Sequence, residues 1–104
     1  MTPFAEGQEE RIIEAVKEHI DQYLRTGRDV GFGLVASTQD NRDHIAQIGK
    51  SILCTRWGVG YPGGSFAQAV VDNDLREAFG RADHINLNCI RFYVSLMYNQ
   101  TYVV

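Results

Sequence analysis

The segment 84–99 constrains the fold most, because its apolar residues are too many for one stripe of a helix. At 100° per residue they cover about two thirds of the helix circumference, and the polar residues form one narrow stripe. The apolar residues are Ile85, Leu87, Cys89, Ile90, Phe92, Tyr93, Val94, Leu96, Met97 and Tyr98, and the polar ones are Asn88, Arg91, Ser95 and Asn99. A small helical monomer has difficulty burying such a helix on more than one side. The segment therefore predicts a homo-oligomer in which this helix packs against a copy of itself.

Helical periodicity extends over much of the remaining chain. Between 8 and 26, apolar residues recur at spacings of three and four, and Gly27 is a natural stop. Capping boxes at 37–40 and at Ser65 with Gln68 predict the starts of two more helices, and Asp83 is expected to cap the last one. We therefore expect an all-α fold in a single domain, 1–104. The expected architecture is a small bundle of three to four helices, at about 8–26, 39–54, 65–80 and 84–99.

Two segments do not have this periodicity. Between 28 and 37, Val30, Phe32, Leu34 and Ala36 alternate with smaller residues, but two glycines interrupt them and no second strand exists to pair with. This pattern predicts a short extended connector. The segment 55–64 holds four glycines and a proline in ten positions, which predicts a loop.

Composition narrows the class of protein. Thirteen acids against ten bases give a net charge of −3, which excludes a strongly basic binder of long nucleic acids. The chain shows neither a secretory leader nor an apolar run near the roughly 20 residues of a membrane span, so we expect a cytoplasmic protein without a membrane partner. Cys54 and Cys89 have no CxxC partner and are expected to be free, buried thiols. The three histidines lack ligand spacing, so neither a metal nor another cofactor is expected.

The glycine-rich loop is the first candidate site. Residues 58–63 match the G-x-G-x-x-G pattern, but the parallel sheet that this motif needs is not available in this chain. A glycine-rich turn before a capped helix still offers backbone N–H groups to an anion. The candidate ligand-binding residues here are Arg56, Trp57, Tyr61, Gly63 and Gly64, which combine a cation, two aromatic faces and free amides. The alternative is a helix connector whose aromatic residues close the core.

The turn between the last two predicted helices is the second candidate. Arg81, Asp83 and Asn86 lie there, and Arg81 repeated by symmetry in an oligomer would line an anion pocket. The alternative is a helix corner in which Asp83 caps and Arg81 pairs with it. No catalytic residues are assigned, because the chain lacks a nucleophile elbow and neither cysteine has a histidine close in sequence.

The segment 62–99 resembles small helical proteins of tailed phages. The resemblance is carried by Pro-Gly-Gly-Ser-Phe at 62–66, Asn-Asp-Leu at 73–75, Ala-Phe-Gly-Arg-Ala-Asp at 78–83, Asn86 and Tyr-Asn at 98–99. Among such proteins the chain is most similar to the anti-CBASS sponges, which sequester cyclic oligonucleotide signals of host immunity. The resemblance implies an all-helical, hexameric, non-enzymatic protein of the host cytoplasm that holds cyclic di- and trinucleotides between subunits. It also implies that Arg81, Asp83 and Asn86 face the ligand.

Two other functions fit the same residues. A protein-interaction or inhibitor module would use the apolar C-terminal helix to bind a host protein instead of a copy of itself. A small enzyme would need Cys89 or His84 to find a partner in space. The placement of three arginines, Arg56, Arg81 and Arg91, discriminates between the nucleotide sponge and the interaction module. Their convergence in one pocket favours the sponge, and their scatter over the surface favours the module.

Overall fold

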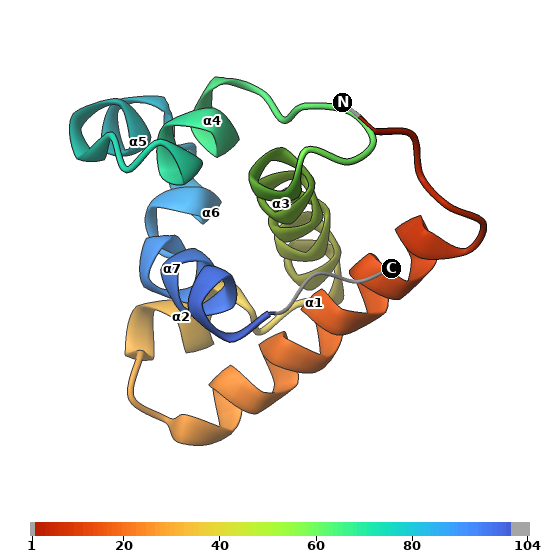
Figure 1. Cartoon of the computed structure of the whole chain (residues 1–104). Coiled ribbons are helices and arrows are strands. Elements are labelled where there is room, and N and C mark those ends of the chain that lie inside the picture. Colours follow the sequence, from red (N-terminus) through yellow and green to blue (C-terminus); the bar gives the residue numbers. More distant parts are fainter. Residues whose placement is uncertain (1, 101–104) are drawn as a thin grey trace.

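The computed structural model describes residues 2–100, and over this range the fold is all-α, as the sequence predicts. These residues form seven helices, and Figure 1 shows α3 in the middle of the molecule with other helices packed around it. In chain order the helices are α1 (Gln8–Thr26), α2 (Val30–Val35), α3 (Gln39–Trp57), α4 (Ser65–Val71), α5 (Leu75–Arg81), α6 (His84–Leu87) and α7 (Ile90–Asn99). In the described part of the chain, no helix is long and apolar enough to cross a membrane.

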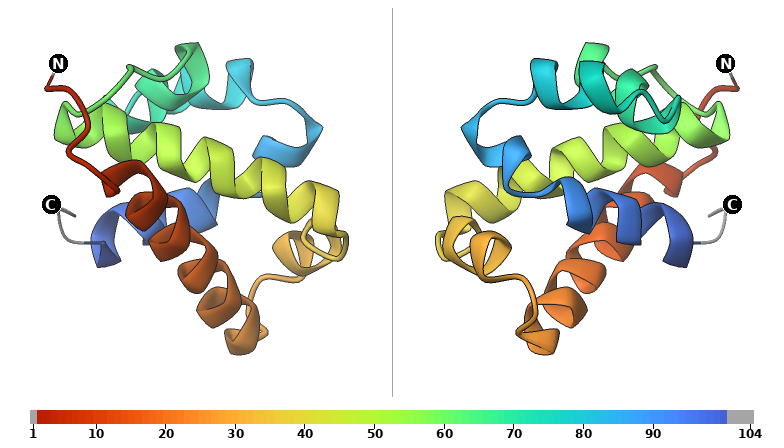
Figure 2. Two further views of the ribbon diagram at one scale, coloured as in Figure 1. Left: turned by 90° about the vertical axis from the view of Figure 1, so that its right-hand side faces the viewer. Right: turned by 90° about the vertical axis from the view of Figure 1, so that its left-hand side faces the viewer.

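The two longest helices, α1 and α3, have 19 residues each and pack against each other. They cross obliquely (Figure 2), and Gly49 lets them approach closely. A Cβ added at Gly49 would lie 2.7 Å from Cγ1 of Val16. Gly27 ends α1 in the left-handed conformation, with φ of 63°, as predicted. The oblique crossing leaves room on one side of α3 for α4 and on another for α7.

The core is built from one apolar face of each long helix and closed by α7. Phe32 of α2 stacks on Phe92 of α7 with ring centroids 4.7 Å apart, and Tyr23 meets both rings edge-on. The largest fully buried apolar side chains are Tyr93, Phe32, Phe92, Ile12, Ile45, Ile52, Leu53 and Leu96. Aromatic contacts thus join elements that are distant in sequence.

The predicted extended connector at 28–37 is wrong, because its central residues form helix α2. The Asp29 side chain caps this helix by accepting a hydrogen bond from the Phe32 backbone N–H at 3.1 Å. At the other end, Asn41 Nδ2 donates to the Val35 carbonyl at 2.8 Å and Arg42 Nε donates to the Ala36 carbonyl at 2.6 Å. Its own N-cap residue and two side chains of α3 therefore satisfy the two ends of a helix that its glycines disfavour.

The predicted helices at 65–80 and 84–99 are each divided in two. Asn73 adopts φ of 58° between α4 and α5, and Asp74 starts α5 by accepting from the Glu77 N–H at 3.2 Å. Ser65 is the first residue of α4 rather than its cap, which is Gly64. Asp83 caps α6 as predicted, but α6 ends at Leu87, and α7 begins after Cys89. The described residues therefore form seven helices where the sequence predicts three to four, and the additional ones are short.

An extended contact joins the N-terminal segment to the loop after α3. Thr2 forms an isolated parallel β-bridge with Val59, in which the Thr2 N–H donates to Gly58 and the Gly60 N–H donates to Thr2. The Phe4 ring occupies the space where a Cβ of Gly60 would lie, and Gly60 has φ of 68°. Glycine at position 60 is therefore required by both the backbone conformation and the close approach of Phe4.

Candidate functional site

The glycine-rich loop begins three residues later than predicted, because α3 extends to Trp57. Arg56 and Trp57 therefore lie on the last turn of α3. Trp57 is partly buried against the core, whereas Tyr61 is 84% exposed. These two aromatic faces do not have equal access to a ligand, since one contacts the core and the other faces solvent.

The backbone of the loop is already bonded within the chain. The Gly63 N–H donates to Thr55 Oγ1 at 2.8 Å, and the Gly63 carbonyl accepts from Gln68 Nε2 at 2.8 Å. The Gly64 carbonyl accepts from the Gln68 N–H at 3.0 Å, within the first turn of α4. Gly63 is also packed tightly, because a Cβ there would lie 2.5 Å from Cβ of Ala67. These contacts give the glycines a role in joining α3 to α4.

The corner residues at 81–86 also form ion pairs and hydrogen bonds within the chain. Arg81 is exposed and pairs with Glu77 at 3.1 Å, not with Asp83. Asp83 Oδ1 accepts from the Asn86 N–H at 2.7 Å, and Asp83 Oδ2 lies 3.3 Å from His44 Nε2 of α3. The His44 contact lacks hydrogen-bond alignment, so the buried Nε2 has no hydrogen-bond partner among the described residues.

The Asn86 side chain is buried, and its Oδ1 accepts a hydrogen bond from the Tyr93 hydroxyl at 2.8 Å. Burial raises the pKa of Tyr93 well above its ordinary value, so this hydroxyl stays protonated and donates. The bond ties the short helix α6 to α7 inside the core. Asn86 and Asp83 thus organise the corner, and Arg81 is the corner residue whose guanidinium faces solvent.

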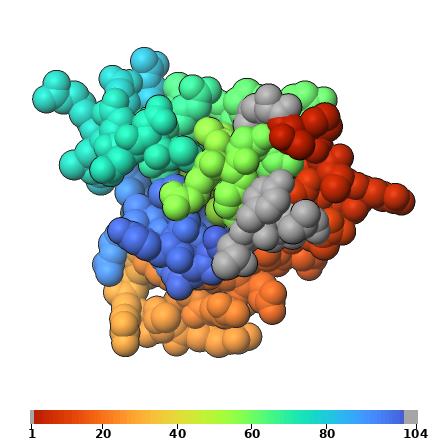
Figure 3. All heavy atoms as spheres, in the orientation of Figure 1, coloured from red at the N-terminus to blue at the C-terminus, as the bar shows by residue number. Residues whose placement is uncertain are grey.

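Two adjoining grooves lie on either side of the outward face of α7. One, of about 340 Å³, contains Arg56, and the other, of about 440 Å³, contains Arg91. Val94 and Tyr98 line both grooves and are 39% and 86% exposed, and together we call them the α7 ridge. Figure 3 shows α7 at the surface between α4 and α5 above and the α1–α2 region below. Arg56 and Arg91 therefore flank one apolar ridge, whereas Arg81 lines neither groove.

The chemical character of these grooves suits an apolar or anionic partner, because none of the described residues that line them carries a carboxylate. The side chains that line the first are Arg56, Val70, Val71, Asn73, Val94, Met97 and Tyr98. Those that line the second are Tyr23, Ile90, Arg91, Val94, Ser95, Tyr98 and Asn99. The apolar excess in 84–99 indicated this surface from the sequence. Its continuation onto α4 and the last turn of α3 depends on tertiary packing and had no sequence signal.

A polar contact beneath α7 joins it to α1. His19 is buried, and its Nε2 lies 3.1 Å from Ser95 Oγ, which Asn99 Nδ2 also contacts at 3.3 Å. Burial lowers the pKa of His19 below 6.5, so the imidazole is neutral at neutral pH. His19 is therefore a packing residue of α1 that contacts the Phe92 ring of α7.

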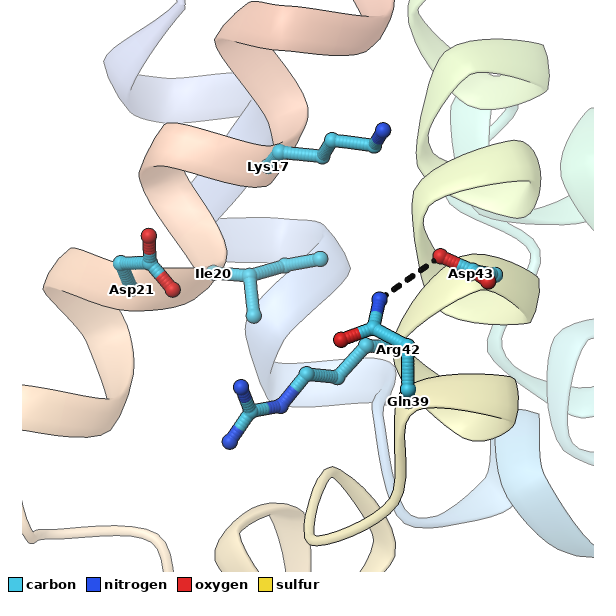
Figure 4. A pocket seen from close by; sticks show the side chains of 6 residues that line it. All are labelled: Lys17, Ile20, Asp21, Gln39, Arg42 and Asp43. Atoms are coloured by element: carbon cyan, nitrogen blue, oxygen red, sulfur yellow. Dashed lines mark hydrogen bonds between the residues drawn. The ribbon is translucent and has the colours of Figure 1, made fainter.

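A third hollow lies between α1 and α3, and sequence analysis missed it. Six residues line this cleft of about 280 Å³, namely Lys17, Ile20, Asp21, Gln39, Arg42 and Asp43 (Figure 4). The pairs Lys17–Asp21 and Gln39–Asp43 have the i,i+4 spacing that places two residues on one helix face. This spacing was the available signal, but a single sequence does not show which two faces meet.

Both cysteines are free and buried, as predicted. In residues 2–100, no group of three or more histidine, cysteine or acidic side chains is placed to hold a metal ion. The described residues present three candidate surfaces: the α7 grooves, the corner at 81–86 and the α1–α3 cleft.

No protein-family model, curated protein or solved structure shows significant similarity to the chain.

Proposed function

We propose that the chain is a phage-encoded, non-enzymatic binding protein that forms homo-oligomers and sequesters cyclic di- or trinucleotides. The resemblance to anti-CBASS sponges suggests the ligand class and a hexamer. The observation that carries the proposal is the position of Arg56 and Arg91 on either side of the α7 ridge, in grooves whose described lining residues include no carboxylate.

The chemistry of a cyclic oligonucleotide matches these groups. Its phosphates are anions that an arginine fork contacts with two charge-assisted hydrogen bonds. Its bases are flat and stack on aromatic rings, and the Tyr98 ring is 86% exposed. Among the residues that the structure describes, a ligand in these grooves would meet two cations and an aromatic face.

An oligomer would turn the open grooves into enclosed sites. Val94 lies between the two grooves, so a second copy that packs on the α7 ridge would cover both of them. Enclosure strengthens the arginine–phosphate contacts, because it removes water from around the charges. Binding between subunits then follows from the same surface that drives assembly.

Native mass spectrometry with a panel of cyclic di- and trinucleotides tests the proposal directly. We expect a multimer that retains about one nucleotide per interface. Arg56→Ala and Arg91→Ala should each lower nucleotide affinity at least about tenfold, whereas Arg25→Ala, an exposed change on α1, should leave it unchanged. A monomer, or a multimer that retains none of the nucleotides, would refute the proposal.

Arg81→Ala separates the two candidate surfaces. The resemblance implies that Arg81 contacts the ligand, so this variant should also lose affinity if a neighbouring subunit brings its corner to the groove. Retained tight binding by Arg81→Ala, together with loss in Arg56→Ala, would place the ligand on the α7 grooves alone.

The second candidate is a protein-interaction or inhibitor module that binds a host protein through the α7 ridge. The observation that favours it is the separation of Arg81 from Arg56 and Arg91, since the three arginines do not converge in one groove. A pull-down with the wild-type chain and with Val94→Asp as the matched bait tests it. A host protein retained by the first bait and lost from the second, without nucleotide binding, would favour this function.

A further inference from the structure

The cleft between α1 and α3 has four charged side chains around an apolar floor. Ile20 forms the floor and is 2% exposed. Lys17 and Asp21 come from α1, and Arg42 and Asp43 come from α3. This cleft is separate from the α7 grooves, because the two surfaces share no lining residue.

Two of the four charged side chains are held in place by neutral partners. Arg42 Nε donates to the Ala36 carbonyl at 2.6 Å, and Figure 4 shows its guanidinium extending from α3 toward α1 below Ile20. Asp43 Oδ1 accepts from Gln39 Nε2 at 2.9 Å. An arginine fork fixed in this way loses little conformational freedom when it binds a carboxylate.

The four charges do not neutralise one another. None of the four charged side chains of the cleft forms an ion pair within 4 Å with a residue of the described range 2–100. The two cations and the two carboxylates therefore remain available to a ligand. Their formal charges cancel, so the cleft has no net preference for a simple anion or a simple cation.

The arrangement of the charges indicates a ligand of mixed charge. In Figure 4, Lys17 and Arg42 lie at opposite ends of the cleft, and Asp21 and Asp43 lie on opposite walls between them. A phosphate on Arg42 would also meet the carboxylates, and a plain amine would also meet the cations. A zwitterion places its carboxylate on the arginine fork and its ammonium between the aspartates, which satisfies both signs.

We propose that the α1–α3 cleft binds a small zwitterion of the α-amino acid class, with its apolar side chain over Ile20. The volume of about 280 Å³ limits the ligand to a small molecule. This site is independent of the proposed nucleotide grooves, so either can fail without the other.

Three matched probes test the ligand class by NMR titration of the full chain. Leucine carries both charges, N-acetyl-leucine lacks the ammonium, and leucine amide lacks the carboxylate. We expect saturable shifts of cleft residues with leucine, and affinities at least about tenfold weaker for both capped forms. Absence of saturable shifts with leucine and phenylalanine up to about 10 mM would overturn the proposal. Equal binding of N-acetyl-leucine would overturn it too, because the site would then be a plain anion site.

Variants on the same helices test the location. Asp21→Asn removes a carboxylate from the cleft, and Glu14→Gln removes an exposed carboxylate of α1 that does not line it. Arg42→Lys retains the positive charge and removes the fork. We expect Asp21→Asn and Arg42→Lys to weaken leucine binding and Glu14→Gln to leave it unchanged, with thermal unfolding measured to check that each variant is folded. Unchanged affinity in both Asp21→Asn and Arg42→Lys would rule out the cleft as the site.

Discussion

The two cysteine thiols are shielded by the core and held in the protonated form. Cys54 and Cys89 are 1% and 0% exposed. Burial, reinforced by the carboxylates of Asp29 and Asp83, raises the pKa of Cys89 to about 12, and burial also raises the pKa of Cys54. We therefore expect neither thiol of the native protein to react with iodoacetamide near neutral pH, and both to react in denaturant. Mass spectrometry counts the added groups, and rapid alkylation of the folded chain would contradict the packing.

His19 links stability to pH. Its pKa lies below 6.5 in the folded state because of burial, so the unfolded chain binds the extra proton first as the pH falls. The free energy of unfolding should therefore be highest above about pH 6.5 and should decrease as the pH falls through the folded-state pKa. Urea unfolding at several pH values measures this decrease. His19→Gln should reduce it, and His84→Gln, an exposed histidine, should leave it unchanged.

The hydrogen bond between Tyr93 and Asn86 is a buried polar contact of the core. Tyr93→Phe removes the donor and leaves the buried Asn86 Oδ1 without its partner. An unsatisfied buried acceptor costs about 1–3 kcal/mol, so we expect a decrease of this size in the free energy of unfolding. Chemical denaturation measures it. A decrease below about 0.5 kcal/mol would mean that water or another group replaces the hydroxyl.

At the scale of the helices, the sequence predicts the long ones well and the short ones poorly. The stripe from Ile12 to Ile20 and the stop at Gly27 are local signals, and α1 follows them closely. Segment 28–37 misleads because Phe32 and Ala36, both buried, are four residues apart. That spacing fits a strand face as well as one turn of a helix, and only Asp29 and the side chains of α3 decide between them.

The divided helices could not be predicted from periodicity either. The helical spacing of the apolar residues is the same before and after Asn73, and also before and after Asn88. Periodicity therefore predicts two continuous helices. The polar run at 72–74 contains an asparagine that tolerates the left-handed conformation and an aspartate that caps α5. This signal is visible in the sequence once turn chemistry is weighed against hydrophobic spacing.

Two glycines inside helices should respond to alanine in opposite ways. A Cβ at Gly33 of α2 meets nothing within 4 Å, so Gly33→Ala should stabilise the protein by about 0.5–1 kcal/mol through helix propensity. A Cβ at Gly49 would lie 2.7 Å from Val16 and 3.1 Å from Leu96, so Gly49→Ala should destabilise it by about 1–3 kcal/mol. Thermal unfolding of the matched pair measures both. Equal effects would mean that α1 and α3 adjust their crossing at little cost.

At the scale of the whole molecule, the sequence could indicate a surface but not the residues that complete it. Two side chains of the apolar segment 84–99, Val94 and Tyr98 of the α7 ridge, remain exposed. They lie on the helix for which the sequence predicts an interface. The grooves beside the ridge bring Arg56 of α3 and Arg91 of α7 around the same two side chains. Residues 35 positions apart in the chain meet there only through tertiary packing, which no spacing rule describes.

We expect the chain to assemble through the α7 ridge, and a substitution there tests this expectation. Val94→Asp places a charge at the centre of the proposed interface, so we expect it to dissociate the oligomer without altering helix content. Leu34→Asp is the matched control, because Leu34 is an exposed leucine of α2, 72% exposed, outside both grooves. Light scattering after size exclusion measures the mass. A wild-type monomer, or a Val94→Asp protein of unchanged mass, would remove the ridge from the interface.

The position of Trp57 gives the molecule an intrinsic fluorescent reporter. It is the one tryptophan of the chain, and it packs partly against the core at the end of α3. Its neighbour Arg56 lines a groove beside the α7 ridge, so the indole lies one residue from the proposed nucleotide surface and on a helix that also forms the α1–α3 cleft. Emission intensity and wavelength can therefore follow unfolding and be compared across ligand and subunit titrations without an attached dye.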